Sequence, residues 1–103
     1  STSKIFIFQL NEEAIGQVRF DFENNVWLID YSIEKLYRGK GLGKLMLKQI
    51  LETFKSEYPI LAYVKIENIA SAKVFDSLGF KKNEIVEINN KIFQIFEKWK
   101  TSM

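Results

Sequence analysis

The sequence predicts a single mixed α/β domain of the α+β type, with a mostly antiparallel sheet, a parallel central pair of strands and covering helices. Three observations lead to this prediction. The first third of the chain holds three short strand-like segments separated by polar turns. A long amphipathic helical pattern comes next and is followed by an apolar strand pattern. The chain closes with a shorter helical pattern and two more strand-like segments. The expected order is therefore β-β-β-α-β-α-β-β.

Three strands are expected at residues 5–10, 14–22 and 26–33. Residues 5–10 form an apolar run rich in β-branched and aromatic side chains. In the next two segments apolar and polar residues alternate, so each strand should bury one face. Because the turns between the three segments are short and polar, the strands should form an antiparallel meander.

A long helix is expected at residues 42–58, because apolar residues recur at every fourth position: Leu42, Met46, Ile50, Phe54 and Tyr58. Pro59 should end this helix, since the residue before a proline avoids the helical region. Residues 60–66 are almost wholly apolar, as expected of a strand that is covered on both faces. A strand-helix-strand crossover makes this strand a parallel neighbour of residues 26–33.

A second helix is expected from residue 69 to residue 78, with Asn68 as its N-cap. Gly79 and Phe80 form a helix stop, because glycine takes the left-handed position and the apolar residue packs back.

Two final strands are expected at residues 84–88 and 91–99. They are joined by Asn89-Asn90, a pair that tolerates the positive φ angles of a hairpin turn. The sequence has no linker, repeat or low-complexity segment, so residues 4–100 should form one domain.

The amino-acid composition argues against several classes of site and partner. The net charge of +2 is too small to indicate a nucleic-acid partner by itself. The absence of cysteine excludes disulfides and thiolate metal sites and suits a reducing compartment. The absence of histidine removes the commonest general base and the commonest transition-metal ligand. No apolar run reaches membrane-spanning length. We therefore expect a cytoplasmic protein with no metal, no membrane contact and no nucleic-acid partner.

The segment Arg-Gly-Lys-Gly-Leu-Gly-Lys at residues 38–44 places three glycines and three cations just before the long helix. Glycine lets several N–H groups point at one spot, and a helix N-terminus adds free donors and a positive dipole end. This segment is an anion cradle suited to a phosphate or pyrophosphate. It does not match the ATP-binding P-loop, since Leu45 follows Lys44, nor the dinucleotide fingerprint, since Met46 replaces the last glycine.

The pattern Arg-x-x-Gly-x-Gly before a helix resembles the acetyl-coenzyme A pyrophosphate loop of the GNAT N-acetyltransferase superfamily. Residues 64–82, VKIENIASAKVFDSLGFKK, resemble the family's second signature of strand, Asn, helix and Gly-Phe. Asn68 matches the family's pantetheine-contacting asparagine. The resemblance covers residues 14–99 and implies a GNAT-like fold, an acyl-CoA N-acyltransferase-like domain and acetyl-CoA as co-substrate, with no metal.

The resemblance has one departure at the start of the chain. Family members usually begin with a strand followed by two helices that form much of the acceptor-binding wall, and the expected domain lacks this unit. The alternatives are a minimal version, a fragment of a longer chain, or a wall supplied by a partner. We therefore expect a homodimer or a part of a larger chain.

A second departure is Phe75, at the place where many members carry a tyrosine that protonates the leaving thiolate. Phenylalanine has no such proton. Residues 68–71, Asn-Ile-Ala-Ser, look like the Asn-x-x-Ser variant of the branches that acetylate ribosomal-protein termini and amino sugars. In those branches the serine can contact the thiol sulfur. Ser71 is thus the candidate proton donor, with an additional helix-cap hydroxyl as the alternative.

The resemblance also implies where the thioester lies, in the gap where the strands at residues 26–33 and 60–66 splay apart. A backbone N–H near Ser32 or Ile33 would polarise its carbonyl. Tyr31 could line the acetyl pocket and joins Ser71 as a catalytic candidate, the alternative being a core aromatic. The expected cofactor-binding residues are Tyr31, Ser32, Ile33, Arg38, Gly39, Lys40, Gly41, Leu42, Gly43, Lys44, Asn68 and Ser71.

The general base is open, because the chain has no histidine. Asp30, Glu34 and Glu67 lie near the expected opening, and water could relay the proton. The alternative for each acid is a solvated surface carboxylate.

The expected function is an N-acetyltransferase that moves an acetyl group from acetyl-CoA to a primary amine, an amino sugar or a protein or peptide amine. One alternative is a non-catalytic acyl-CoA-binding or assembly module of a larger or oligomeric protein, suggested by Phe75 and the short N-terminal part. Another is an anion or nucleic-acid binder that uses four cations and shows salt-dependent affinity, namely Arg38, Lys40, Lys44 and Lys48.

Overall fold

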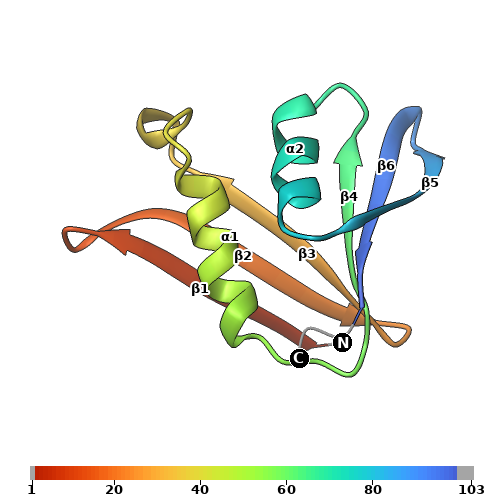
Figure 1. Ribbon diagram of the computed structural model, residues 1–103, viewed down its shortest axis with the longest axis horizontal. Helices are drawn as coiled ribbons and strands as arrows, with labels where there is room; N and C mark the ends of the chain where they lie inside the picture. The colour runs from red at the N-terminus through yellow and green to blue at the C-terminus, as the bar shows by residue number, and fades with distance from the viewer. Residues whose placement is uncertain (1, 100–103) are drawn as a thin grey trace.

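The computed structural model describes residues 2–99 of the chain. Its strands are β1 (Thr2–Leu10), β2 (Glu13–Glu23), β3 (Val26–Ile33), β4 (Ile60–Lys65), β5 (Lys81–Ile88) and β6 (Lys91–Lys98). Its helices are the short 3-10 turn η1 (Lys35–Tyr37), α1 (Leu42–Thr53) and α2 (Ile69–Ser77). The six strands form one sheet in the order β1-β2-β3-β4-β6-β5 (Figure 1).

All neighbouring strands in this sheet are antiparallel except β3 and β4, which are parallel. The predicted element order and the mixed sheet with one parallel pair are therefore confirmed. Residue 100, the last of the expected domain, lies outside the described residues. Within residues 2–99 the helices are too short or too polar to cross a membrane.

The three hairpin turns have the same backbone geometry. Both central residues have positive φ in Asn11-Glu12, Asn24-Asn25 and Asn89-Asn90. This geometry matches the right-handed twist of the flanking strands, and asparagine tolerates it better than most residues. The predicted hairpin at Asn89-Asn90 is confirmed, as are the two turns of the meander.

The two α-helices cover the same face of the sheet. α1 packs on β2 and β3, whereas α2 packs on β4. Trp27 of β3 lies directly beside Ile60 of β4, and residues opposite each other in a parallel pair share a face. One core forms beneath both helices, composed of Val18, Phe20, Ile29, Ile33, Met46, Leu47, Leu51, Phe54, Ile60, Ala62, Val64, Phe75, Phe80 and Phe96.

The opposite side of the sheet, here called the open face, is not covered by α1 or α2. The register places these side chains on it: Ile5, Ile7, Arg19, Leu28, Asp30, Leu61, Tyr63 and Phe93. The expectation that residues 60–66 are covered on both faces is therefore wrong. Ala62 and Val64 are buried under the helices, whereas Tyr63 is 42% exposed.

The long helix ends earlier than its periodicity predicts. α1 ends at Thr53, and Phe54 already has extended backbone angles (φ −84°, ψ 108°). The extended backbone brings the Phe54 ring onto Phe20, with 4.0 Å between centroids and 5° between planes. Tyr58 packs against Phe22 at 5.0 Å. The fourfold spacing thus continues past the helix because these rings pack on β2, and the prediction of a helix to residue 58 was wrong.

The first strand of the last hairpin begins earlier than expected. β5 starts at Lys81 instead of residue 84, and its pairing with β6 is shifted between Lys82 and Ile85. The irregularity is held by Asn83, whose Nδ2 donates to Glu97 at 2.7 Å. Such a bulge breaks the alternation of side chains, which is why residues 81–83 lack a strand pattern.

Candidate active site

The site begins where β3 and β4 separate. Their ladder contains two residue pairs, Trp27 with Ile60 and Leu28 with Leu61, and beyond these pairs the strands diverge (Figure 1). The N–H of Glu34 donates to Ile15 in β2 at 2.8 Å. Because N–H groups alternate in direction along a strand, residues at odd positions of β3 point theirs toward β4.

This alternation distinguishes the two backbone donors that the sequence left open. The N–H of Ile33 points into the gap between β3 and β4. The N–H of Ser32 points the other way, toward its partner Gln17 in β2. A carbonyl lying in the gap could therefore be polarised by Ile33 but not by Ser32.

The N-terminus of α1 presents free backbone donors. Its N-cap is Gly41, which has no capping side chain, and the first helical bond runs from Leu45 N–H to Gly41 at 3.2 Å. The three N–H groups between them, those of residues 42–44, therefore have no partner within the helix. Such a terminus binds anions through its donors and its dipole.

Two glycines shape the loop ahead of this helix. Gly39 has φ 77° and Gly41 has φ 74°, in the left-handed region that β-carbons disfavour. A Cβ placed on either glycine would meet no atom within 4 Å. These glycines are thus required by the backbone conformation, and the space in front of them is open to a ligand.

The cations of the loop differ in position. The Nε of Arg38 donates to the carbonyl of Ile33 at 2.9 Å, so this side chain ties the loop to the end of β3. Lys44 lines the cavity described next. The Nζ of Lys40 lies 5.8 Å from the centroid of the Tyr37 ring.

A cavity of about 610 Å³ joins the glycine loop, the end of β3 and the start of α2. Eleven of the twelve expected cofactor-binding residues line it, all except Lys40. It is also lined by Tyr37, Ala70 and Val74, which sequence reasoning missed. The spacing of Ala70 and Val74 puts them on one side of α2 with Ser71, a signal that the sequence carried. Tyr37 carried no such signal.

The two catalytic candidates meet at this cavity. The hydroxyl of Tyr31, from β3, lies 2.8 Å from the hydroxyl of Ser71, from α2, and either can be the donor. The backbone N–H of Ser71 donates to Oδ1 of Asn68 at 3.1 Å, which confirms Asn68 as the N-cap of α2. Within residues 2–99 the Ser71 hydroxyl bonds to Tyr31 and to no helix carbonyl.

Phe75 lies one turn further along α2 and holds Tyr31 in place. Its ring is 3% exposed and meets the Tyr31 ring edge-on at 5.8 Å, with Phe80 at 5.0 Å on another side. Tyr31 therefore packs against the core, as the alternative expected, and also lines the cavity. Its ring packs against the core, while its hydroxyl faces the cavity.

Two further cavities continue from this point to the open face. One of about 350 Å³ begins at Tyr31, Asn68 and Ser71 and passes through the gap between β3 and β4. The other, of about 530 Å³, lies on the open face and shares four lining residues with it, namely Ile29, Asp30, Tyr63 and Phe93. The three cavities thus form a series from the glycine loop to the open face, joined by shared lining residues, and this series is called the path below.

The three acids considered as a base lie at different places. Asp30 lines both cavities of this path. Glu34 lines a separate cavity beside Arg38, and Glu67 lines none of the cavities described. Within residues 2–99 no group of three or more acidic side chains is placed to hold a metal ion.

The sequence of this chain is similar to those of known acetyltransferases. Residues 1–80 match the acetyltransferase (GNAT) family. A probable spermine N(1)-acetyltransferase from Bacillus subtilis subsp. natto (strain BEST195) is 33% identical over 75 residues, which are 70% of this chain and 49% of that protein. The chain spans about half the length of the curated relatives it matches.

Solved structures show the same fold. A putative GNAT-family acetyltransferase from Bordetella pertussis superposes with a TM-score of 0.80 at 16% identity, covering 93% of this chain and 65% of that one. A structure of AAC(6')-Ib in complex with ribostamycin and coenzyme A superposes with a TM-score of 0.76 at 17% identity, covering 94% and 64%. At these identities the likeness concerns the fold alone.

Proposed function

Because the chain belongs to the GNAT acetyltransferase family, we propose that it transfers an acetyl group from acetyl-CoA to a primary amine. The observation that carries this proposal is the hydroxyl pair of Tyr31 and Ser71, 2.8 Å apart. The pair lies where the cavity from the glycine loop meets the gap between β3 and β4. An anion cradle, a route through the sheet and a proton donor are thus arranged along one path.

The glycine loop and the start of α2 suit coenzyme A. Its pyrophosphate would accept from the free N–H groups at the start of α1, with Lys44 adding charge. The Oδ1 of Asn68 is occupied by Ser71, so its Nδ2 is free to donate to the pantetheine arm. Acetyl-CoA supplies the thioester, and the chain supplies the groups around it.

The chemistry needs a polarised carbonyl, a neutral amine and a protonated leaving group. The N–H of Ile33 would stabilise the negative charge that develops on the carbonyl oxygen as the amine attacks. When the carbon–sulfur bond breaks, a proton from the Tyr31–Ser71 pair passes to the sulfur, and water then returns a proton to the pair. Asp30 would accept the proton that the amine loses, because it is the acid on the path.

Binding and turnover test this function separately. Coenzyme A at a hundred times its Kd should stabilise the fold by about 2.7 kcal/mol. For a domain of this size the melting temperature should rise by about 10–20 °C. Acetyl-CoA and an acceptor amine should then release free thiol together. A rise in melting temperature without acetylation of any amine would support the acyl-CoA-binding module instead.

We also propose that the protein is a homodimer located in the cytoplasm. The lack of cysteine is compatible with a reducing compartment. β1 is an edge strand, and its side chains Ile5 and Ile7 are 53% and 54% exposed on the open face. Exposed apolar edges of this kind favour association.

Light scattering should accordingly give twice the 12.1 kDa mass of one chain. The variant with both Ile5→Lys and Ile7→Lys should be monomeric, because lysines block the pairing of edge strands. A strictly monomeric parent protein at high concentration would contradict the dimer.

A further inference from the structure

We propose that the acceptor is a small amine with one ammonium group on an apolar or aromatic body, and not a polyamine. The inference rests on the proposed transferase function and names the acceptor class of the same site. It follows from the residues that line the path between Ser71 and the open face.

The floor of the cavity on the open face is mostly apolar. The cavity is lined by four apolar or aromatic side chains on this floor, and by four further residues. The first set is Leu28, Tyr63, Ile88 and Phe93, and the second is Ile29, Asp30, Asn89 and Lys91. The rings of Tyr63 and Phe93 lie edge to face, 6.3 Å apart, so an aromatic corner is already formed. A cavity of about 530 Å³ has the size of a small-molecule pocket. Such a floor suits an apolar body.

The charged residues along the path favour a single positive charge on the ligand. Among the described residues that line the two cavities, Asp30 is the one acid, whereas Lys65 and Lys91 are cations. One ammonium group can pair with Asp30. A second ammonium on the same ligand would meet no carboxylate along the path and would be repelled by the lysines.

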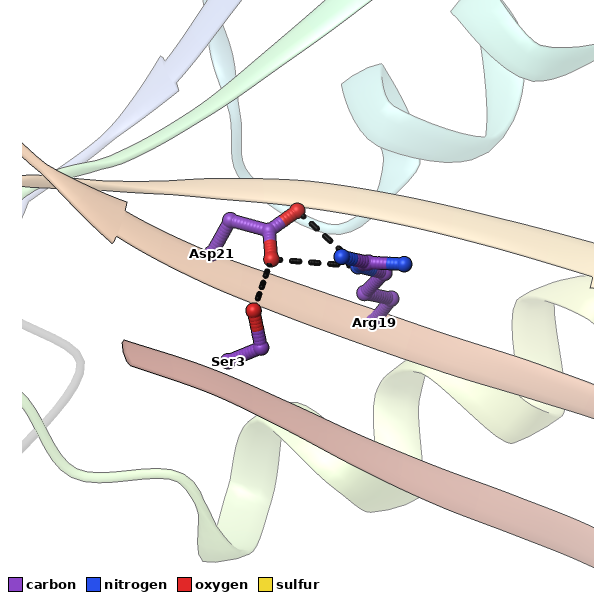
Figure 2. Close-up of polar contacts among 3 residues, drawn as sticks. All are labelled: Ser3, Arg19 and Asp21. Carbon is purple, nitrogen blue, oxygen red and sulfur yellow. Dashed lines mark hydrogen bonds and ion pairs between the residues drawn. The ribbon is translucent and has the colours of Figure 1, made fainter. Parts of the chain in front are cut away.

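The neighbour of Asp30 across the strands directs its Nε toward another carboxylate. Arg19 lies opposite Asp30 in the β2–β3 pair. Its Nε donates to both carboxylate oxygens of Asp21, at 3.0 and 3.1 Å, and the hydroxyl of Ser3 donates to Asp21 as well (Figure 2). Within residues 2–99 the side chain of Asp30 makes no hydrogen bond or ion pair of its own.

The engagement of Arg19 is maintained at neutral pH. The hydrogen bond from Ser3, followed by that from Arg19, holds the pKa of Asp21 below its usual value. Asp21 is therefore ionised at neutral pH, as its ion pair with Arg19 requires. Asp30 is left to face the cavity.

Asp30 also lies close to the catalytic candidates Tyr31 and Ser71. It lines the cavity in the gap together with Tyr31 and Ser71. An amine paired with Asp30 thus stands at the mouth of the gap while its body rests on Tyr63 and Phe93. The proposed binding site for the acceptor therefore adjoins the groups that would carry out the transfer.

Titration calorimetry on the full chain saturated with coenzyme A tests this class, with 2-phenylethylamine and spermine as probes. We expect 2-phenylethylamine to bind at least about tenfold more tightly than spermine. Equal or tighter binding of spermine overturns the proposal, and so does the absence of saturable binding by 2-phenylethylamine.

Charge reversal provides a second measurement. The double variant Lys65→Glu with Lys91→Glu should shift the ratio of the two affinities toward spermine by about tenfold. The matched control is Lys48→Glu with Lys55→Glu, which changes the net charge equally at exposed positions outside the path. If the two double variants give the same ratio, the lysines of the path do not select the acceptor and the proposal fails.

The failure of this inference is distinguishable from the failure of the proposed function. Preferential binding of 2-phenylethylamine without acetylation of either amine contradicts the transferase function and leaves the ligand class standing. Acetylation with a preference for spermine contradicts the ligand class and leaves the transferase function standing.

Discussion

Replacing Ser71 by alanine is expected to lower kcat for acetyl transfer by about a hundredfold or more, because a positioned proton donor contributes at least that much. Its hydroxyl lies 2.8 Å from that of Tyr31. The affinity for coenzyme A should stay within a few-fold, since the cap of α2 uses the backbone N–H of Ser71 and not its side chain. Steady-state kinetics with a good amine acceptor measures kcat, and calorimetry measures the affinity for coenzyme A.

Two further variants show whether the hydroxyl pair acts as one unit. Tyr31→Phe keeps a ring against Phe75 and removes only the hydroxyl. If the proton passes through both groups, the double variant should be little slower than either single variant. Independent roles would instead make the two losses multiply.

Ser77 offers a matched control on the same helix. Its hydroxyl is exposed and donates to the carbonyl of Val74 at 2.8 Å, within α2. Ser77→Ala should therefore leave kcat unchanged. Full turnover in Ser71→Ala as well would mean that solvent protonates the thiolate, and the assignment of Ser71 would be wrong.

Replacing Gly41 by valine is expected to weaken coenzyme A binding by about a hundredfold. A β-branched residue at φ 74° costs about 1–2 kcal/mol. The loop would relax by turning the free N–H groups of α1 away from the pyrophosphate, and a hydrogen bond to a charged group contributes about 1.5–3 kcal/mol. Losses of this size correspond to one to two orders of magnitude in Kd, which calorimetry measures directly.

The contrast between variants at this loop separates backbone geometry from charge. Gly41→Asn should bind clearly better than Gly41→Val, because asparagine tolerates the left-handed region. Lys40→Ala should cost less than Gly41→Val, because Lys40 does not line the cavity. Near-normal binding by Gly41→Val would show that the pyrophosphate site has been misplaced.

Gly43 is less suitable for this test, although it lines the same cavity. A Cβ at Gly43 would lie 3.3 Å from Cε2 of Tyr31 and 3.7 Å from Cγ1 of Ile33. Substitution there would disturb the catalytic candidate and the anion cradle together, so a loss could not be assigned to either.

The sequence by itself determined the features that depend on neighbouring residues. The order of strands and helices follows from the spacing of apolar side chains. The hairpins follow from asparagines that accept positive φ, and the glycine loop follows from the same property of Gly39 and Gly41. The cap of α2 follows from Asn68, whose side chain reaches a donor three residues ahead.

Other features were decided only by the tertiary structure, because they depend on contacts between distant segments. α1 ends at Thr53 because Phe54 stacks on a ring of β2, which apolar spacing cannot distinguish from one more helical turn. Tyr31 and Ser71 are 40 residues apart, and they meet only because α2 folds back over the end of β3.

The separation of β3 from β4 likewise decides what each candidate can reach. It opens the gap toward which the N–H of Ile33 points, whereas that of Ser32 is used in the pairing with β2. It also puts Asp30 on the path through the sheet and leaves Glu34 and Glu67 off it. Spacing along the chain places all of these residues near one opening, but the direction of each group is set by the pairing and divergence of strands.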